Sequence, residues 1–281
     1  MNRLPREKQI QVISALVEGC SIRATERMTD VHRDTIMRLG VRIGEGCEAL
    51  HDASMRGLQV PRIELDEIWA YVGKKQRRTT PEDVAEKGNQ YSFLAMDATG
   101  KAIISYRTGK RDAEMTHSFI CDLRERVINA PEISSDGFDP YPNAIEAAFG
   151  ADVAYGRIVK VYRDEPGKNA ARRYSPGYVV NAHRERIEGR PQHISTSLVE
   201  RGNLTLRMSQ RRFTRLTNGF SKTLRNHKAA VSLYVSHYNF CRVHETTRIT
   251  PAMALGVADH IWTIGELVEA ASNPLTELIK P

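Results

Sequence analysis

Three carboxylates stand in sequence settings where they could hold metal ions. Asp66 lies in IELDEIWAYV, among apolar neighbours where a charge is costly to bury without a partner or an ion. Asp136 ends the segment ISSD, and Glu200 lies in SLVERGNLTLR. Mg²⁺ prefers oxygen ligands, and two such ions about 4 Å apart can position a nucleophile and stabilise the charge that develops when a phosphodiester is cleaved. The three residues therefore predict a site for two Mg²⁺ ions, for which Mn²⁺ could substitute.

Each carboxylate also has a simpler interpretation. Strand alternation puts either Asp66 or Glu67 on an outer face, where it is solvated. Asp136 followed by a glycine is also typical of a plain turn, and Glu200 can pair with a basic neighbour on its helix. The prediction of a metal site therefore depends on whether the surrounding elements bring the three residues together. Three further acidic residues are left outside the predicted site: Glu67, Asp97 and Asp139.

The chain from residue 62 onward alternates between strand and helix patterns. It predicts three consecutive antiparallel strands, then a helix, a short strand, a short helix and a further strand. The predicted ranges, in chain order, are 62–73, 91–99, 101–109, 112–127, 131–137, 140–150 and 151–163. This is the order of a ribonuclease-H-like α/β fold, a mixed sheet with flanking helices. In that fold the first and fourth strands are adjacent and a later helix crosses them, so the three carboxylates would converge.

The first 47 residues carry apolar residues at helical spacing, which predicts three short helices. Gly19 can end the first helix and Ser21 can cap the second, and a further break falls at Thr29-Asp30. Two short helices joined by a tight turn indicate a small all-α helix-turn-helix domain. The start of the second of these helices would face the DNA major groove, so the predicted contacts are His32, Arg33 and Thr35. A helical bundle used for packing or dimerisation is the alternative.

Changes in composition divide the chain into four parts. The helix-turn-helix domain is predicted over 1–48, and residues 49–61, which have little periodicity, predict a linker. The ribonuclease-H-like domain is predicted over 62–256, with a polar, basic and turn-rich insertion at about 164–193. Residues 257–281 are predicted to form a C-terminal helical tail.

Three segments resemble the insertion-sequence-one family of DDE transposases: LDEIWAYVG, SSDGFDPY and above all LVERGNLTLRMSQRRFTRLTNGFSK. The resemblance extends over about residues 62 to 256. In that family the Asp of D-E-x-W, the Asp of the D-G turn and the Glu of E-R-x-N-L bind the catalytic metal. The resemblance therefore implies that role for Asp66, Asp136 and Glu200.

The same resemblance implies roles for three further residues. A basic residue seven positions beyond the Glu touches substrate DNA near the cut, which implies that role for Arg207, and Asn203 would support the site. The segment HYNFCRVHETTRITPAMALG is similar to the end of several transposase and integrase catalytic domains, where His244 would be either an active-site neighbour or a structural histidine. The chain departs from the family in two respects. It lacks the N-terminal zinc-binding element of many members, and its interval between the second and third carboxylates is longer than in the best-known ones.

Basic residues continue beyond Glu200. From Arg207 to Lys228 the chain has seven basic residues and no acidic one, which predicts a long helix whose basic face follows DNA phosphates. The predicted contacts on this helix are Arg207, Arg211, Arg212 and Arg215. A second basic cluster just after the first strand would hold the flanking DNA strand beside Asp66, and it comprises Lys74, Lys75, Arg77 and Arg78. The alternative for either group is a solvated charged face.

Composition limits the partners and the location. The net charge of +7 and the isoelectric point near 9.3 favour a polyanionic partner. The four cysteines stand far apart, with no C-x-x-C pair, which favours free thiols in a reducing compartment over a zinc finger. No signal peptide, membrane span or small-molecule cofactor is expected, so the protein is predicted to be cytoplasmic and nucleoid-associated.

The resemblance implies a DNA transposase that binds the ends of its element and catalyses 3′-end cleavage and strand transfer into target DNA. Because two ends must be cut and joined together, a homodimer or a larger assembly on DNA is expected. Two alternatives remain: a ribonuclease-H-like nuclease without strand transfer, such as a junction resolvase, and a repressor derived from a transposase that has lost catalysis. The helix-turn-helix argues against the first, and the intact set of carboxylates argues against the second.

Overall fold

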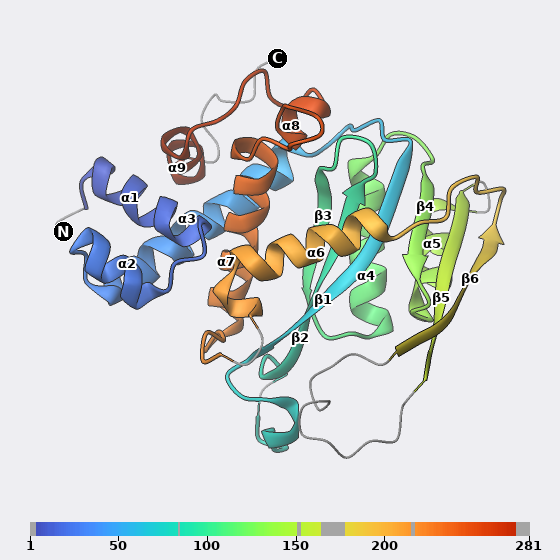
Figure 1. Cartoon of the computed structure of the whole chain (residues 1–281), viewed down its shortest axis with the longest axis horizontal. Coiled ribbons are helices and arrows are strands. Elements are labelled where there is room, and N and C mark those ends of the chain that lie inside the picture. The colour runs from blue at the N-terminus through green and yellow to red at the C-terminus, as the bar shows by residue number, and fades with distance from the viewer. Residues whose placement is uncertain (1–3, 84, 151–152, 164–177, 215–216, 274–281) are drawn as a thin grey trace.

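The computed structural model describes residues 4–83, 85–150, 153–163, 178–214 and 217–273 of the chain. Within these residues six strands form one sheet with helices on both faces (Figure 1). The strands are β1 (Arg62–Val72), β2 (Gly88–Asp97), β3 (Ile103–Gly109), β4 (Glu132–Asp136), β5 (Ala154–Arg163) and β6 (Tyr178–Glu188). Their order across the sheet is β3-β2-β1-β4-β5-β6.

The directions of the strands match the predicted fold. β1 pairs antiparallel with β2, and β2 pairs antiparallel with β3. β4 lies between β1 and β5 and is parallel to both. The chain therefore has a ribonuclease-H-like α/β fold, as predicted. The antiparallel strand β6 was not predicted, because residues 178–188 fall inside the predicted insertion; residues 164–177 of that insertion lie outside the described residues.

Helices cover the sheet in two layers, with α4 and α5 on one face and α6 and α7 on the other (Figure 1). The helices are α1 (Arg6–Val17), α2 (Ile22–Thr29), α3 (Arg33–Ser54), α4 (Ala113–Arg126), α5 (Pro140–Phe149), α6 (Ser197–Ser209), α7 (Leu224–Ser236), α8 (Pro251–Ala254) and α9 (Ile264–Ser272). The helices predicted over 112–127 and 140–150 are thus confirmed as α4 and α5. In the described part of the chain, no helix has the length and apolar character needed to cross a bilayer.

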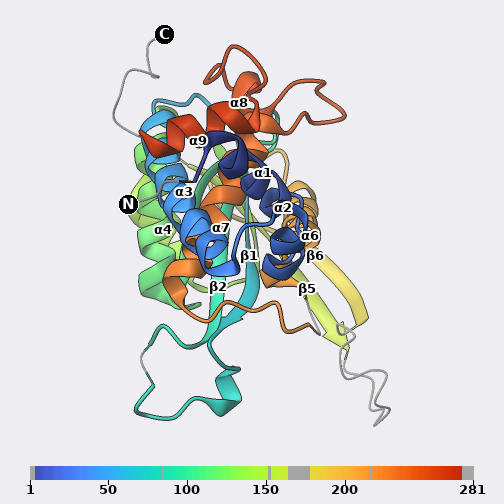
Figure 2. The same ribbon diagram turned by 90° about the vertical axis from the view of Figure 1, so that its left-hand side faces the viewer.

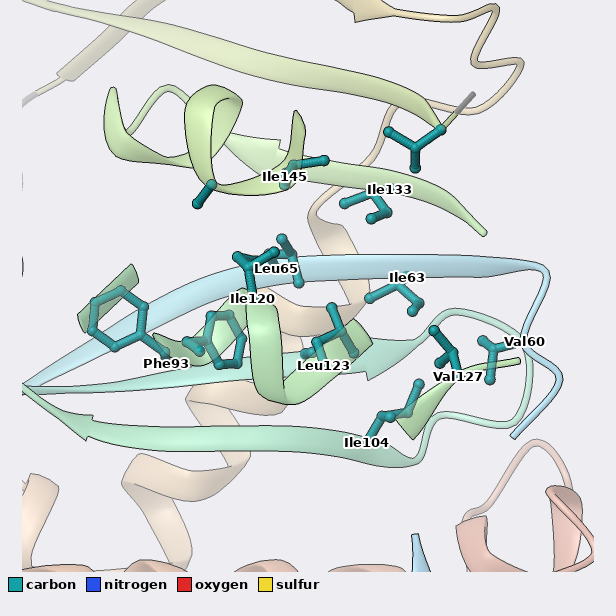
Figure 3. Close-up of a cluster of buried hydrophobic side chains, with 14 of the residues drawn as sticks. Val60, Ile63, Leu65, Phe93, Ile104, Ile120, Leu123, Val127, Ile133 and Ile145 are labelled. Carbon is teal, nitrogen blue, oxygen red and sulfur yellow. The ribbon is translucent and has the colours of Figure 1, made fainter. Parts of the chain in front are cut away.

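Side chains that alternate along β1 belong to the hydrophobic clusters on both faces of the sheet. Leu65 belongs to the cluster that packs Phe93 of β2 against Ile120 of α4 (Figure 3). Ile68, three positions on, faces the other way and packs with Val199 of α6. Each such buried side chain stabilises the fold by about 1.5–3 kcal/mol. The same alternation directs Asp66 toward α6 and Glu67 toward α4.

The pairing of β1 with β4 is short. It extends only from Arg62 opposite Glu132 to Glu64 opposite Ser134, while β1 continues beside β2 as far as Val72. Beyond Glu64 the two parallel strands diverge and no longer pair with each other. Side chains near their carboxyl ends can therefore approach one another. Such carboxyl ends are where open α/β sheets form their sites.

The three N-terminal helices follow the predicted breaks. Gly19 has φ +80°, and a Cβ there would lie 2.8 Å from the carbonyl oxygen of Ser209, so this position requires glycine on both grounds. The Ser21 hydroxyl accepts a hydrogen bond from the backbone N–H of Ala24 (3.1 Å) and caps α2. Asp30, at φ 56°, ends α2 in the left-handed conformation. The predicted caps and breaks are therefore confirmed.

The predicted linker over 49–61 is wrong in its first half, because α3 continues to Ser54. Its remainder belongs to the core beneath α4, where Leu58 and Val60 are buried. α3 itself packs against the C-terminal helices α7 and α9 (Figure 2). The contact is so close that a Cβ on Gly44 would lie 2.1 Å from the Ala229 carbonyl oxygen. The N-terminal helices thus share a hydrophobic core with the end of the chain.

The predicted long basic helix is interrupted. α6 ends at Ser209, a single 3₁₀ turn follows (η3, Arg211–Phe213), and α7 begins only at Leu224. Residues that form helices poorly, including an Asn-Gly pair at 218–219, separate the two. The predicted C-terminal tail is helical in α9, and residues 274–281 lie outside the described part.

Candidate active site

Three carboxylates meet where β1 and β4 diverge. One oxygen from each of Asp66, Glu67 and Asp136 lies within 4.8 Å of the other two. The structure thus brings together two of the three predicted metal ligands. It also adds Glu67, whose predicted place outside the site is wrong. Because β4 has left β1 at this point, residues from both faces of β1 can approach Asp136.

Burial and mutual repulsion disfavour three negative charges in this cluster. Burial, followed by the charge of Asp136, raises the pKa of Asp66 to about 6. The same two causes raise the pKa of Glu67 to about 7. Oε1 of Glu67 is buried and makes no hydrogen bond of ordinary geometry among the described residues, although the Tyr141 hydroxyl lies close enough to the carboxyl to lower its pKa. A bound divalent cation would neutralise the cluster and supply that oxygen with a partner, so these residues fit a metal site.

Glu200 and Asn203 reach the cluster from α6, on which they lie one turn apart. The Asn203 amide donates a hydrogen bond from Nδ2 to Oδ2 of Asp66 (2.8 Å) and lowers the pKa of that carboxyl. The charge of Glu200 raises the same pKa, so it acts on the same site. Asn203 therefore contacts Asp66, and Glu200 lies near enough to the same carboxyl to affect its charge.

Glu200 is nevertheless not a member of the tight cluster. Its Oε1 accepts a hydrogen bond from Nζ of Lys160 on β5 (2.5 Å) and another from the Thr196 hydroxyl (2.7 Å). The alternative interpretation, pairing with a basic neighbour on the same helix, is thus replaced by a pair with the adjacent strand. Lys160 occupies the position of a counter-ion between the sheet and Glu200.

Glu64 fixes the helix that carries Glu200, and sequence reasoning missed it. Its buried carboxylate accepts hydrogen bonds at Oε2 from the backbone N–H groups of Leu198 (2.7 Å) and Val199 (3.0 Å). These are orphan donors of the first turn of α6. Thr196, the N-cap residue, makes no side-chain cap, since its hydroxyl donates to Glu200. The only sequence signal was a second acid two positions before Asp66.

Arg111, between β3 and α4, was missed as well. Its Nε donates to Oε2 of Glu67 (3.1 Å), and its Nη2 lies 3.6 Å from Oδ2 of Asp136. Its guanidinium carbon lies 3.8 Å from the centroid of the Phe138 ring, in cation–π geometry. Arg111 thus bridges two members of the cluster. Nothing in the sequence around it distinguishes it from other basic loop residues.

The predicted basic contacts beyond Glu200 are only partly exposed. Arg207 is partly buried on α6 and Arg211 is exposed. Arg212 is partly buried: its guanidinium donates to the Ser221 hydroxyl (2.9 Å), and burial lowers its pKa. Arg215 lies outside the described residues.

The other predicted DNA contacts lie on different surfaces. His32 and Arg33 are exposed at the start of α3, whereas Thr35 is half-buried there. Lys74 forms an ion pair with Asp83 (2.5 Å), and Lys75 is exposed. Both lysines follow the far end of β1, about 25 Å of extended chain from Asp66, so their predicted place beside that residue is wrong.

His244 lies outside the carboxylate site. It begins a turn in which its backbone carbonyl accepts from the N–H of Arg248 (2.8 Å). Partial burial and then the charge of Lys101 lower the pKa of its imidazole, and none of the carboxylates of the cluster contributes. This placement favours the structural interpretation of His244 over the prediction of an active-site neighbour.

Comparisons with known proteins add little to these observations. No protein-family model matches the chain, and neither does any curated protein sequence. Among solved structures, a chain of the crystal structure of the Mos1 strand transfer complex is similar, with 14% sequence identity and a TM-score of 0.21. The match covers 52% of this chain and 56% of that one. The fold assignment therefore stands on the strand order described above.

Proposed function

We propose that this chain is a DNA transposase that binds the ends of its element and catalyses metal-dependent 3′-end cleavage and strand transfer into target DNA. The observation that carries the proposal is the approach of Asp66 and Asp136 from adjacent strands, with Glu200 and Asn203 facing them from α6. Each of these four residues was assigned to one site by motifs that resemble the insertion-sequence-one family.

Asp66, Asp136 and Glu200 would hold Mg²⁺ or Mn²⁺, with Glu67 as a neighbour that tunes the charge of the site. When bound, two such ions would supply Lewis-acid stabilisation of the phosphate and a more acidic water or hydroxyl nucleophile. The chain's own residues prepare this site. Asn203 fixes the orientation of Asp66 through its hydrogen bond, and packing against β1 holds α6 in place.

The exposed start of α3 supports the proposed recognition of element ends, with His32 and Arg33 as the residues that would reach DNA. Paired cutting and joining of two ends implies a homodimer or a larger assembly on DNA. A nuclease without strand transfer would use the same carboxylates, so the reaction products must distinguish the two functions.

The test combines purified protein, a labelled element end and target plasmid, with Mg²⁺ or with chelator. We expect joined products with Mg²⁺ that disappear in Asp136→Asn. Asp139→Asn is the matched control, because Asp139 is 97% exposed and lies just three residues away. Cutting without joining would favour the nuclease, and binding without cutting or joining in any divalent metal would contradict the proposal.

A further inference from the structure

The face of the sheet that carries Asp66 continues outward into basic residues. Asp136 on β4 is paired with Ile158 on β5, and Ile158 with Arg184 on β6. Paired residues point to the same face, so Arg184 lies in the row of Asp136, two strands or roughly 10 Å away. Arg186, two positions along β6, points to this face as well. The outer strands thus extend the candidate site with positive charge.

A groove of about 1020 Å³ lies beside this row. Six of the residues that line it are Arg62, Arg184, Arg186, His193, Ser197 and Leu198. The last two begin α6, so the groove ends within one turn of Glu200. It therefore extends from the outer strands to the start of the helix that carries Glu200.

Two of the three guanidinium groups in this groove, those of Arg184 and Arg186, are not paired with carboxylates among the described residues, whereas Arg62 interacts with the charge of Asp97. Arg184 donates from Nε to the carbonyl oxygen of Ile194 (2.8 Å), and Arg186 is exposed. Neither forms an ion pair within the described part of the chain. Glu64 contributes a carboxylate to the groove lining, but its Oε2 already accepts from the first turn of α6. The groove therefore carries net positive charge.

We propose that this groove holds the sugar–phosphate backbone of the DNA strand that leads to the carboxylate site. Arg184 and Arg186 are two positions apart on the extended strand β6, so their charges can contact successive phosphates of a DNA strand. The proposal rests on the proposed function, because it assigns the groove to the substrate of that site. Arg184 and Arg186 are its principal contacts, and Arg62, at the start of β1, is a third.

The experiment measures binding of a fluorescein-labelled DNA duplex with a single-stranded tail, in chelator, over about 50 to 200 mM salt. We expect R184A/R186A to lower the slope of log affinity against log salt by about 0.7–0.9 for each phosphate that the variant no longer neutralises. R184K/R186K keeps both charges and is expected to keep the slope. R186A alone removes no side-chain hydrogen bond among the described residues, and it is expected to lower the slope by the share of a single phosphate, about 0.7–0.9.

An unchanged slope in a folded R184A/R186A variant would overturn the proposal. So would a loss of self-association in that variant with unchanged DNA binding, because the groove would then contact a second copy of the chain. Binding in chelator does not depend on catalysis, which separates the two proposals. If the unmutated chain neither cuts nor joins DNA but R184A/R186A still lowers the slope, the groove stands and the transposase assignment falls. If the unmutated chain joins DNA and the variant binds and joins equally well, the transposase assignment stands and the proposal for the groove falls.

Discussion

Replacement of Glu64 tests whether a buried carboxylate on β1 holds the helix that carries Glu200. Oε2 of Glu64 accepts two backbone hydrogen bonds from α6, at 2.7 and 3.0 Å. Glutamine keeps an acceptor oxygen but loses the charge. Hydrogen bonds to charged groups contribute about 1.5–3 kcal/mol and neutral ones about 0.5–1.5 kcal/mol, so each bond should weaken by about 1–1.5 kcal/mol. For the two bonds, Glu64→Gln should lower the free energy of unfolding by about 2–3 kcal/mol.

Alanine removes the acceptor as well as the charge. The N–H groups of Leu198 and Val199 are then left without a partner at a buried helix end, which costs about 1–3 kcal/mol for each. Glu64→Ala is therefore expected to lower the free energy of unfolding by about 3–6 kcal/mol, more than glutamine does. It should also weaken Mn²⁺ binding more than Glu64→Gln does, because Glu200 lies in the first turn of the released helix.

Urea unfolding followed by circular dichroism gives the stabilities, and calorimetric titration gives the Mn²⁺ affinity. Glu146→Gln is the control, since Glu146 is exposed on α5 and its replacement should stay within about 0.5 kcal/mol. The reasoning would be refuted if glutamine cost as much as alanine. It would also fail if neither variant differed from the control, since the cap would then contribute nothing.

Two further predictions concern other charged groups. Lys160→Ala removes the cation paired with Glu200, and we expect Mn²⁺ affinity to rise about 2- to 5-fold, since the pair is partly exposed and screened; weaker binding in the same titration would show that Lys160 is not a competing counter-ion. His51 is fully buried, and burial lowers its pKa from 6.5 to about 4, so the stability it supports is complete above pH 6.5 and is lost as the pH falls toward 4. The difference in unfolding free energy between the unmutated chain and His51→Gln should therefore shrink by about 1.4 kcal/mol per pH unit over that window, and a constant difference would contradict the assignment.

Local signals in the sequence were sufficient for most of the fold. The break before α2 was predicted because Gly19 and Ser21 act on their immediate neighbours, through a left-handed turn and a side-chain cap. β1 to β5 were predicted because apolar residues alternate with the pleat or fill a buried strand. β6 was missed for the opposite reason: most of its side chains, including Val180 and Arg184, are exposed, so no alternation marks it.

The predictions that failed at the site depend on long-range geometry. Glu64 meets α6 across 134 residues, and Arg111 meets Glu67 across 44. Neither spacing is a local pattern, so no helix or strand signal reports it. Alternation excluded Glu67 from the site because it assumes an intact sheet, whereas β1 and β4 diverge beyond Glu64. Because β1 and β4 stop pairing there, Glu67 can lie beside Asp66 and Asp136 as a third carboxylate.

The position of α6 is set at both ends by distant segments. At its start, Glu64 of β1 accepts hydrogen bonds from its first turn. At its end, the backbone at Ser209 contacts the α1–α2 turn so closely that Gly19 leaves no space for a Cβ. The α1–α2 turn leads directly into α2 and α3, the helices proposed to read DNA. Any movement of those helices on binding DNA must therefore either carry the end of α6 with it or break the contact at Gly19. Because Glu200 lies between the two fixed ends, we expect the proposed recognition of DNA and the proposed catalysis to be coupled through this helix.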